Sequence, residues 1–134
     1  MAGYSHRSLP EKLGIKPATT IVIVNAPFGY VNLLGNLPTV TIKFHLSHSE
    51  SFIQFFTDSK KELETEFPKL KSALSYDGMI WISWPKKSSF KKTDLTEDII
   101  RDIGLANGLV DVKVAAINDD WSGLKFVYRM NDRK

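Results

Sequence analysis

The residues best placed for chemistry form a short basic segment in the second half of the chain. It contains Lys86, Lys87, Ser88, Ser89, Lys91 and Lys92, and no acid. Ammonium groups supply charge and hydroxyls supply hydrogen bonds, so this combination can hold a phosphate or a carboxylate. The alternative interpretation is a solvated basic loop, balanced by the acids that begin at Asp94.

A second candidate is the turn after the apolar run at residues 19–24. Asn25 would end a buried strand with its side-chain amide free, and Gly29 would let a ligand approach the backbone closely. The alternative is that Asn25-Ala26-Pro27 is ordinary turn chemistry. Both interpretations remain open from the residues alone.

Other chemistry is poorly supported. His45 and His48 have ligand-like spacing, with Glu50 nearby, but the two rings would point to opposite faces of a continuing strand. We therefore predict no metal site. No Gly-x-Ser-x-Gly elbow, phosphate-binding Gly-x-x-x-x-Gly-Lys loop or Gly-x-Gly-x-x-Gly turn is present. Catalytic residues stay unknown, and an enzyme is disfavoured without being excluded.

These residues must be positioned by strands and helices. Unalternating apolar runs at 19–24, 52–56 and 79–84 predict strands that are covered on both faces. Helices are expected from two capping signals, Ser59 with Glu62 and Asp94 with Glu97. Pro68 is expected to kink or split the first of these helices.

Alternating patterns at 110–115 and 124–129 predict a C-terminal β-hairpin. The whole order predicts an α/β fold, a three-layer sandwich with a mostly parallel, Rossmann-like sheet that ends in an antiparallel hairpin. In such sheets, ligands bind at the carboxyl ends of the strands, where the turn at Asn25 and the loop at Lys86 would lie.

One connection conflicts with a wholly parallel sheet. Residues 40–46 alternate like an edge strand, and only residues 47–51 separate them from the next strand. A parallel crossover normally needs a dozen residues or more. We therefore predict that 40–46 and 52–56 run antiparallel; the alternative is an edge strand shorter than its alternation suggests.

Size and charge limit the function further. The chain has 134 residues, a net charge of +3 and no cysteine, which predicts one domain over residues 1–134 and suits a reducing compartment. The first residues lack the apolar core of a signal peptide, and no run approaches the ~20 apolar residues of a membrane span. We expect a cytoplasmic protein without a membrane partner, and a nucleic-acid partner is disfavoured because the basic excess is small and local.

Several segments together resemble a bacterial family of small proteins known as a domain of unknown function. They are Gly3-Tyr4-Ser5, 12–17, 84–87, 94–98, 108–114 and 121–125. The resemblance covers nearly the whole chain. It implies no particular activity.

The chain also resembles the core of class I S-adenosylmethionine-dependent methyltransferases, most clearly from Ser59 to Tyr128. That family has three glycines at alternate positions after its first strand and a carboxylate after its second. Laid from Asn25, the glycine positions fall on Pro27, Gly29 and Val31, and the second strand ends in His45-Leu46-Ser47-His48. The region of the family's third strand is missing. The resemblance implies a shared scaffold, and these departures predict that no cofactor is bound.

The predicted function is a non-catalytic binding or regulatory module on a methyltransferase-like scaffold. The partner would be a small anionic ligand or another protein. One alternative is a small-molecule or nucleotide-binding enzyme that uses the carboxyl ends of the strands. A further alternative is nucleic-acid contact through the basic segment at residues 86–92.

Overall fold

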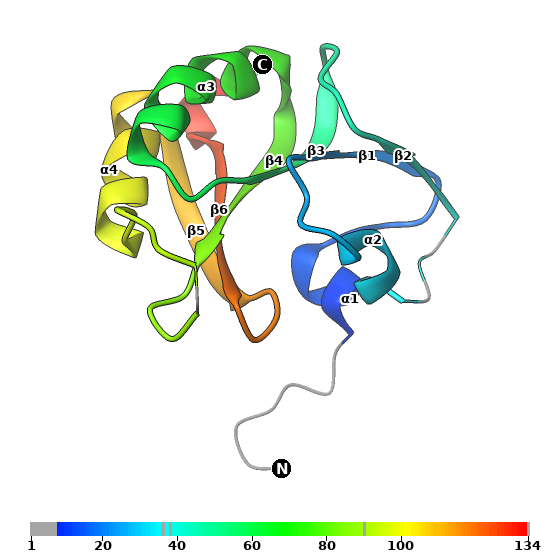
Figure 1. Ribbon diagram of the computed structural model, residues 1–134. Coiled ribbons are helices and arrows are strands. Elements are labelled where there is room, and N and C mark those ends of the chain that lie inside the picture. The colour runs from blue at the N-terminus through cyan, green and yellow to red at the C-terminus, as the bar shows by residue number, and fades with distance from the viewer. Residues whose placement is uncertain (1–7, 36, 38, 90, 134) are drawn as a thin grey trace.

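The computed structural model describes residues 8–35, 37, 39–89 and 91–133. The strands are β1 (Thr19–Val24), β2 (Val40–Lys43), β3 (Glu50–Phe56), β4 (Leu74–Pro85), β5 (Leu109–Ala116) and β6 (Trp121–Tyr128). The helices are α1 (Leu9–Leu13), α2 (Tyr30–Leu33), α3 (Lys60–Ala73) and α4 (Glu97–Ala106), followed by a 3₁₀ turn at Met130–Asp132 (Figure 1).

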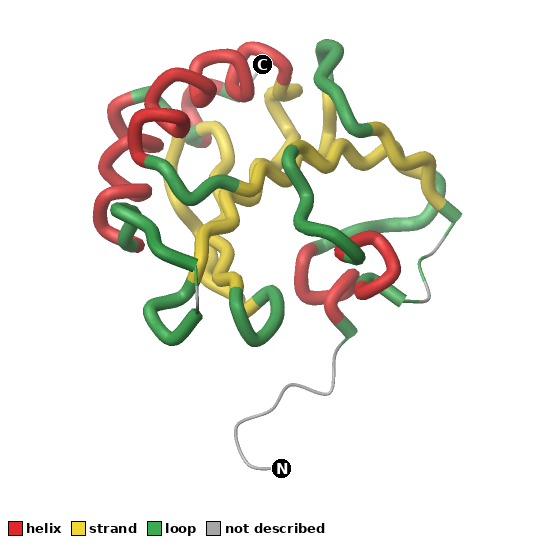
Figure 2. The backbone as a smooth tube through the Cα atoms, viewed as in Figure 1, coloured by secondary structure: helices red, strands yellow, loops and turns green. Residues whose placement is uncertain are grey.

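The strands form one sheet in the order β2-β1-β3-β4-β6-β5. The first four strands of this order are parallel, and β6 pairs antiparallel with both β4 and β5. The predicted fold class, a mostly parallel Rossmann-like sheet with a C-terminal antiparallel hairpin, is confirmed. Figure 2 shows the strands running between two groups of helices.

The sheet is covered on both faces, which gives the predicted three layers. Helices α3 and α4 pack on one face through side chains such as Phe67 and Ile100, whereas α1 and α2 pack on the other through Leu13 and Tyr30 (Figure 1). The indole Nε1 of Trp81 in β4 donates to the Leu13 carbonyl at 2.8 Å, and Trp81 is fully buried. This bond fixes α1 to the middle of the sheet.

The predicted antiparallel pairing at the edge of the sheet is wrong. Strands β2 and β3 lie on opposite sides of β1, and both run parallel to it. The alternative is the right one: the edge strand ends at Lys43, well before Leu46. Lys43 and Ile53 both pair with Val22, from opposite sides of β1. After Lys43 the chain therefore returns along the sheet only from the level of Ile53 to Glu50, where β3 begins.

A compact polar turn makes this short crossover possible. The buried carboxylate of Glu50 accepts hydrogen bonds from Lys43 Nζ at 2.7 Å and from the Ser47 backbone amide at 3.0 Å. Ser49 adopts a positive φ of 56°. Leu46 packs partly buried against the core on the α3 face. Residues 44–49 thus cover part of a face that a longer crossover would cover with a helix.

Three local expectations also need correction. Pro68 does not split its helix, since α3 is continuous and Pro68 lies on its exposed side, where water can satisfy the freed carbonyl. Thr96, not Asp94, caps α4, whereas Asp94 accepts the Lys60 amide at the start of α3. Strand β4 begins directly after α3 at Leu74, earlier than the run at 79–84 suggests.

Candidate functional site

The carboxyl ends of β1, β3 and β4 meet at one edge of the sheet. Val24 is level with Phe55, and Phe55 is level with Ile82, so the loops that follow these strands start side by side. Strand order also reverses here, because the chain leaves β1 for one side of the sheet and returns to β3 on the other. Open α/β sheets bind ligands at such a switch point.

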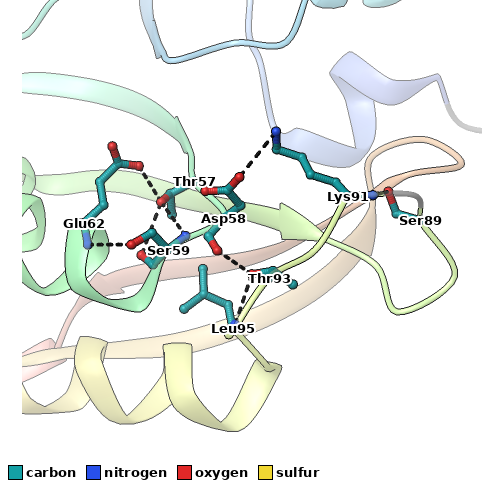
Figure 3. A network of polar contacts seen from close by, with 8 residues as sticks. All are labelled: Thr57, Asp58, Ser59, Glu62, Ser89, Lys91, Thr93 and Leu95. Atoms are coloured by element: carbon teal, nitrogen blue, oxygen red, sulfur yellow. Dashed lines mark hydrogen bonds and ion pairs between the residues drawn. The ribbon is translucent and has the colours of Figure 1, made fainter.

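The loop between β3 and α3 is held by buried hydrogen bonds. Thr57 is buried, and its amide donates to the Ser83 carbonyl at 3.0 Å. The Thr57 hydroxyl donates to Glu62 Oε1 at 2.6 Å and accepts from the Ser59 amide at 3.2 Å (Figure 3). The Ser59 side chain accepts from the Glu62 amide, as the capping signal predicts.

The lysine loop, which comprises residues 86–89 and 91–93, is fastened to this β3–α3 loop. Lys91 Nζ lies 3.3 Å from Asp58 Oδ2, and the Thr93 hydroxyl donates to the Asp58 carbonyl at 2.7 Å (Figure 3). At its start, the Lys86 amide donates to the Asp120 carbonyl at 2.8 Å. These contacts tie the loop at both ends, so its cationic side chains extend from an anchored backbone.

Two clefts adjoin the lysine loop. One, of about 500 Å³, is lined by Lys86, Lys87, Ser89, Lys91, Lys92, Thr93, Asp94, Leu95 and Thr96. The other, of about 440 Å³, adjoins the start of α4 and includes the carboxylates of Glu97 and Asp98. The first is the more cationic, and we call it the lysine cleft.

A separate cleft of about 480 Å³ lies at the switch point. Its lining consists of Val24, Asn25, Phe55, Ser59, Lys61, Glu62, Thr65 and Glu66. We call it the Asn25 cleft. It shares no lining residue with the two clefts at the lysine loop, so Asn25 and the lysines of that loop line different clefts.

The predicted site residues therefore divide into groups. Lys86 and Lys87 line both clefts at the lysine loop, and Asn25 is exposed with a positive φ of 60° in its own cleft. Gly29 is exposed at a φ of 80°, with no heavy atom within 4 Å of where a Cβ would stand. Gly29 and Ser88 line none of these three clefts.

Every carboxylate that lines these three clefts has a structural partner. Glu62 accepts from Thr57, Asp94 accepts from the Lys60 amide, and Glu66 pairs with Lys69. On α4, Arg101 binds Glu97 and Asp98. These carboxylates thus contribute to the packing of the loops and helices around the clefts.

Beneath the turn after β1 lies a buried polar chain that sequence reasoning missed. The Tyr30 hydroxyl donates to Gln54 Oε1 at 2.7 Å, and Gln54 Nε2 donates to Ser83 Oγ at 3.1 Å. Burial raises the pKa of Tyr30 far above its usual range, despite the opposing effect of the hydrogen bond to Gln54. The available signal was Gln54, a polar residue within an otherwise apolar run.

Aromatic rings complete this side of the carboxyl edge. The rings of Tyr30 and Phe56 meet edge to face at 4.7 Å, and those of Phe56 and Trp121 at 5.1 Å. All three side chains are buried, so they fill the space below the turn with protein.

Neither a metal-binding cluster nor a membrane-spanning helix occurs among the residues that the structure describes. Within residues 8–35, 37, 39–89 and 91–133, no three His, Asp or Glu side chains gather closely enough to hold a metal ion. His45 and His48 are both exposed. No helix in this described part of the chain is long and apolar enough to cross a membrane.

The fold is shared with S-adenosylmethionine-dependent methyltransferases of known structure. Magnesium protoporphyrin IX methyltransferase from Synechocystis PCC 6803 with bound SAH matches with a TM-score of 0.62 at 12% identity, over 90% of this chain and 78% of that one. A SAM-dependent methyltransferase from Aquifex aeolicus matches with a TM-score of 0.61 at 13% identity, over 87% of this chain and 85% of that one. A TehB-like SAM-dependent methyltransferase from Corynebacterium glutamicum matches with a TM-score of 0.58 at 10% identity, over 96% of this chain and 91% of that one.

At these identities the likeness establishes the fold alone. No protein-family model matches the chain, and no curated protein matches its sequence. The chain therefore shares the Rossmann-like fold of these methyltransferases. Strand β2 is the outermost strand on its side of the sheet among the residues that the structure describes.

Proposed function

We propose that this protein is a non-catalytic binding module, and that its methyltransferase-like scaffold presents the lysine cleft to a small anionic ligand. The observation that carries the proposal is the fixed geometry of that cleft. Four lysines surround it, and the loop that bears them is tied to β3 and β6 by Asp58 and Asp120. An anchored loop loses less conformational entropy when it binds than a free one does.

Charge at the lysine cleft supports an anion. Lys91 is paired with Asp58, and the Asp94 carboxylate is occupied by the Lys60 amide. Lys86, Lys87 and Lys92 form no ion pair among the residues that the structure describes. Their ammonium groups are therefore available to a carboxylate or phosphate, and the binding should weaken as salt rises.

The turn after β1 supports a role other than methyl transfer. Pro27 and Val31 place side chains where the methyltransferase pattern has glycine. Tyr30, in α2 after this turn, is buried and bonded to Gln54. Together with the engaged carboxylates, this arrangement favours binding without catalysis.

Thermal denaturation in phosphate or sulfate at constant ionic strength tests the proposal. A ligand that binds only the folded state stabilises it by RT ln(1 + [L]/Kd), about 2.7 kcal/mol at a hundredfold excess over Kd. We expect phosphate to raise the melting temperature of the natural protein, and the Lys86→Met/Lys87→Met double variant to lose most of this response. Lys69→Met, on α3, is the control because Lys69 lines neither cleft at the lysine loop. Equal responses in all three proteins would contradict the proposal.

A second candidate is S-adenosylmethionine binding at the Asn25 cleft. It is favoured by the cleft's position at the switch point and by its volume of about 480 Å³, which lies in the usual range for ligand pockets. Structural neighbours include a methyltransferase with bound SAM. Calorimetry with S-adenosylmethionine and S-adenosylhomocysteine distinguishes the two candidates. We expect no measurable heat at micromolar concentration, and a one-to-one isotherm lost in Asn25→Leu would favour the second.

A further inference from the structure

On the α1 face of the C-terminal hairpin, two lysines stand directly opposite each other. Lys113 in β5 pairs in register with Lys125 in β6, so their side chains project from the same face of the sheet. Lys125 is also level with Trp81 of β4, whose side chain lies in the core beneath α1 and α2. The pair therefore faces α1, away from α3 and α4.

A third lysine, Lys16, follows α1 and adds its charge to this pair. Lys16 is exposed, whereas Lys113 and Lys125 are half-buried. Burial lowers the pKa of Lys125, and the charges of Lys113 and Lys16 lower it further. Lys125 is thus the member of this group whose charge is disfavoured both by burial and by its two lysine neighbours.

None of the three has a carboxylate partner within ion-pair distance in the described part of the chain. Lys113 Nζ instead donates to the Lys12 carbonyl at 2.9 Å, which orders the side chain but leaves its charge uncompensated. The nearby acid of β5, Asp111, binds Arg101 of α4 and so serves the opposite face. The cluster is a concentration of positive charge in which a backbone carbonyl holds one member, Lys113.

Folding alone gives no reason for this arrangement. Like charges directly opposite each other in an antiparallel pair destabilise the sheet. A lysine on an edge strand can block unwanted strand pairing, which would account for Lys113 in β5. It does not account for Lys125, because β6 lies inside the sheet between β4 and β5. A bound anion would turn this repulsion into attraction.

We propose that Lys16, Lys113 and Lys125 form a binding site for a small, multiply charged phosphate anion, such as pyrophosphate or the phosphates of a nucleotide. A compact group of three cations fits one such anion, whereas a nucleic-acid strand needs an extended basic track. The site is independent of the lysine cleft. Trp121 pairs with Pro85, which precedes Lys86, and Lys125 lies four residues farther along β6, about 13 Å at the usual strand rise.

The site can be tested by NMR of the lysine side chains after reductive methylation with ¹³C-formaldehyde. In the free protein, Lys125 should titrate below the ordinary lysine range. Saturating pyrophosphate should raise the pKa of Lys125, because a bound anion favours the charged ammonium. An unchanged Lys125 titration in saturating pyrophosphate would overturn the proposal.

Variants test the same site by affinity. Lys125→Met and Lys16→Met should each weaken pyrophosphate binding about tenfold or more in calorimetry. Because Lys16 is exposed, Lys16→Met keeps the test valid even if Lys125→Met folds poorly. Lys69→Met is the control for net charge. The Lys86→Met/Lys87→Met variant should keep full affinity for pyrophosphate at this site, which separates it from the lysine cleft. Unchanged affinity in both Lys125→Met and Lys16→Met, or binding of an oligonucleotide without binding of pyrophosphate or ATP, would refute the proposal.

Discussion

Trp81 connects the sheet to α1, and replacing it measures how much this connection contributes to stability. Its indole is fully buried, and its Nε1 supplies the hydrogen bond to the Leu13 carbonyl. Trp81→Ala leaves a large cavity, which costs about 3–5 kcal/mol. It also leaves the Leu13 carbonyl without its donor, which adds about 1 kcal/mol. This sum approaches the lower end of the usual free energy of unfolding of a domain, which is about 5–15 kcal/mol.

Trp81→Phe separates these two contributions. It keeps an aromatic ring in the core but removes the hydrogen bond and part of the volume, so it should cost about 1–3 kcal/mol. Urea denaturation followed by far-UV circular dichroism measures both variants without depending on tryptophan fluorescence. An unchanged urea midpoint for Trp81→Ala would refute the placement of Trp81 in the core. Equal losses in both variants would mean that the hydrogen bond, not the cavity, dominates.

Two further predictions follow from close contacts and from burial. A Cβ added at Gly104 would lie 2.0 Å from the Phe126 ring, so Gly104→Ala should destabilise the protein by about 1–3 kcal/mol in thermal denaturation, although alanine favours a helix by ~1 kcal/mol. Leu105→Ala is the control, because Leu105 is exposed. A higher melting temperature for Gly104→Ala would mean that α4 lies farther from β6 than the structure places it. Because burial raises the pKa of Tyr30 in the folded state, stability should fall as pH rises above ~10, where the unfolded phenol ionises. Tyr30→Phe should remove this part of the alkaline loss in urea titrations at several pH values, and an identical pH profile would count against a buried Tyr30.

The sequence predicted those elements whose signals are local. Apolar runs located β1, β3 and the core of β4, and the Ser59 capping signal located the start of α3. The edge strand was misjudged because alternation reveals which residues face water but not where pairing stops. Its length depends on the Lys43–Glu50 contact, which joins residues on two different strands and leaves no mark in the pattern.

The candidate sites were predicted in part for a similar reason. The lysines at 86–92 were visible as a run, and they do line clefts at the carboxyl edge. Asn25 lines a different cleft, because residues at the start of α3 form much of its lining. The position of α3 is set by tertiary packing, which the sequence pattern does not reveal. Lys113 and Lys125 each stood out only as a polar residue in an alternating strand. Their pairing requires the register of the hairpin, and an irregularity between Asp111 and Lys113 shifts that register.

The short crossover after β2 bears on the order in which the native structure opens. Strand β2 has four residues and pairs only with β1, and the segment 44–49 after it is held by Glu50 and Leu46. Releasing this unit leaves the pairing of β1, β3 and β4 intact, so it can open without global unfolding. In native-state hydrogen exchange, the amides of β2 should therefore exchange through a smaller opening free energy than those of β3. We therefore expect a slowly exchanging centre and one margin that opens without global unfolding.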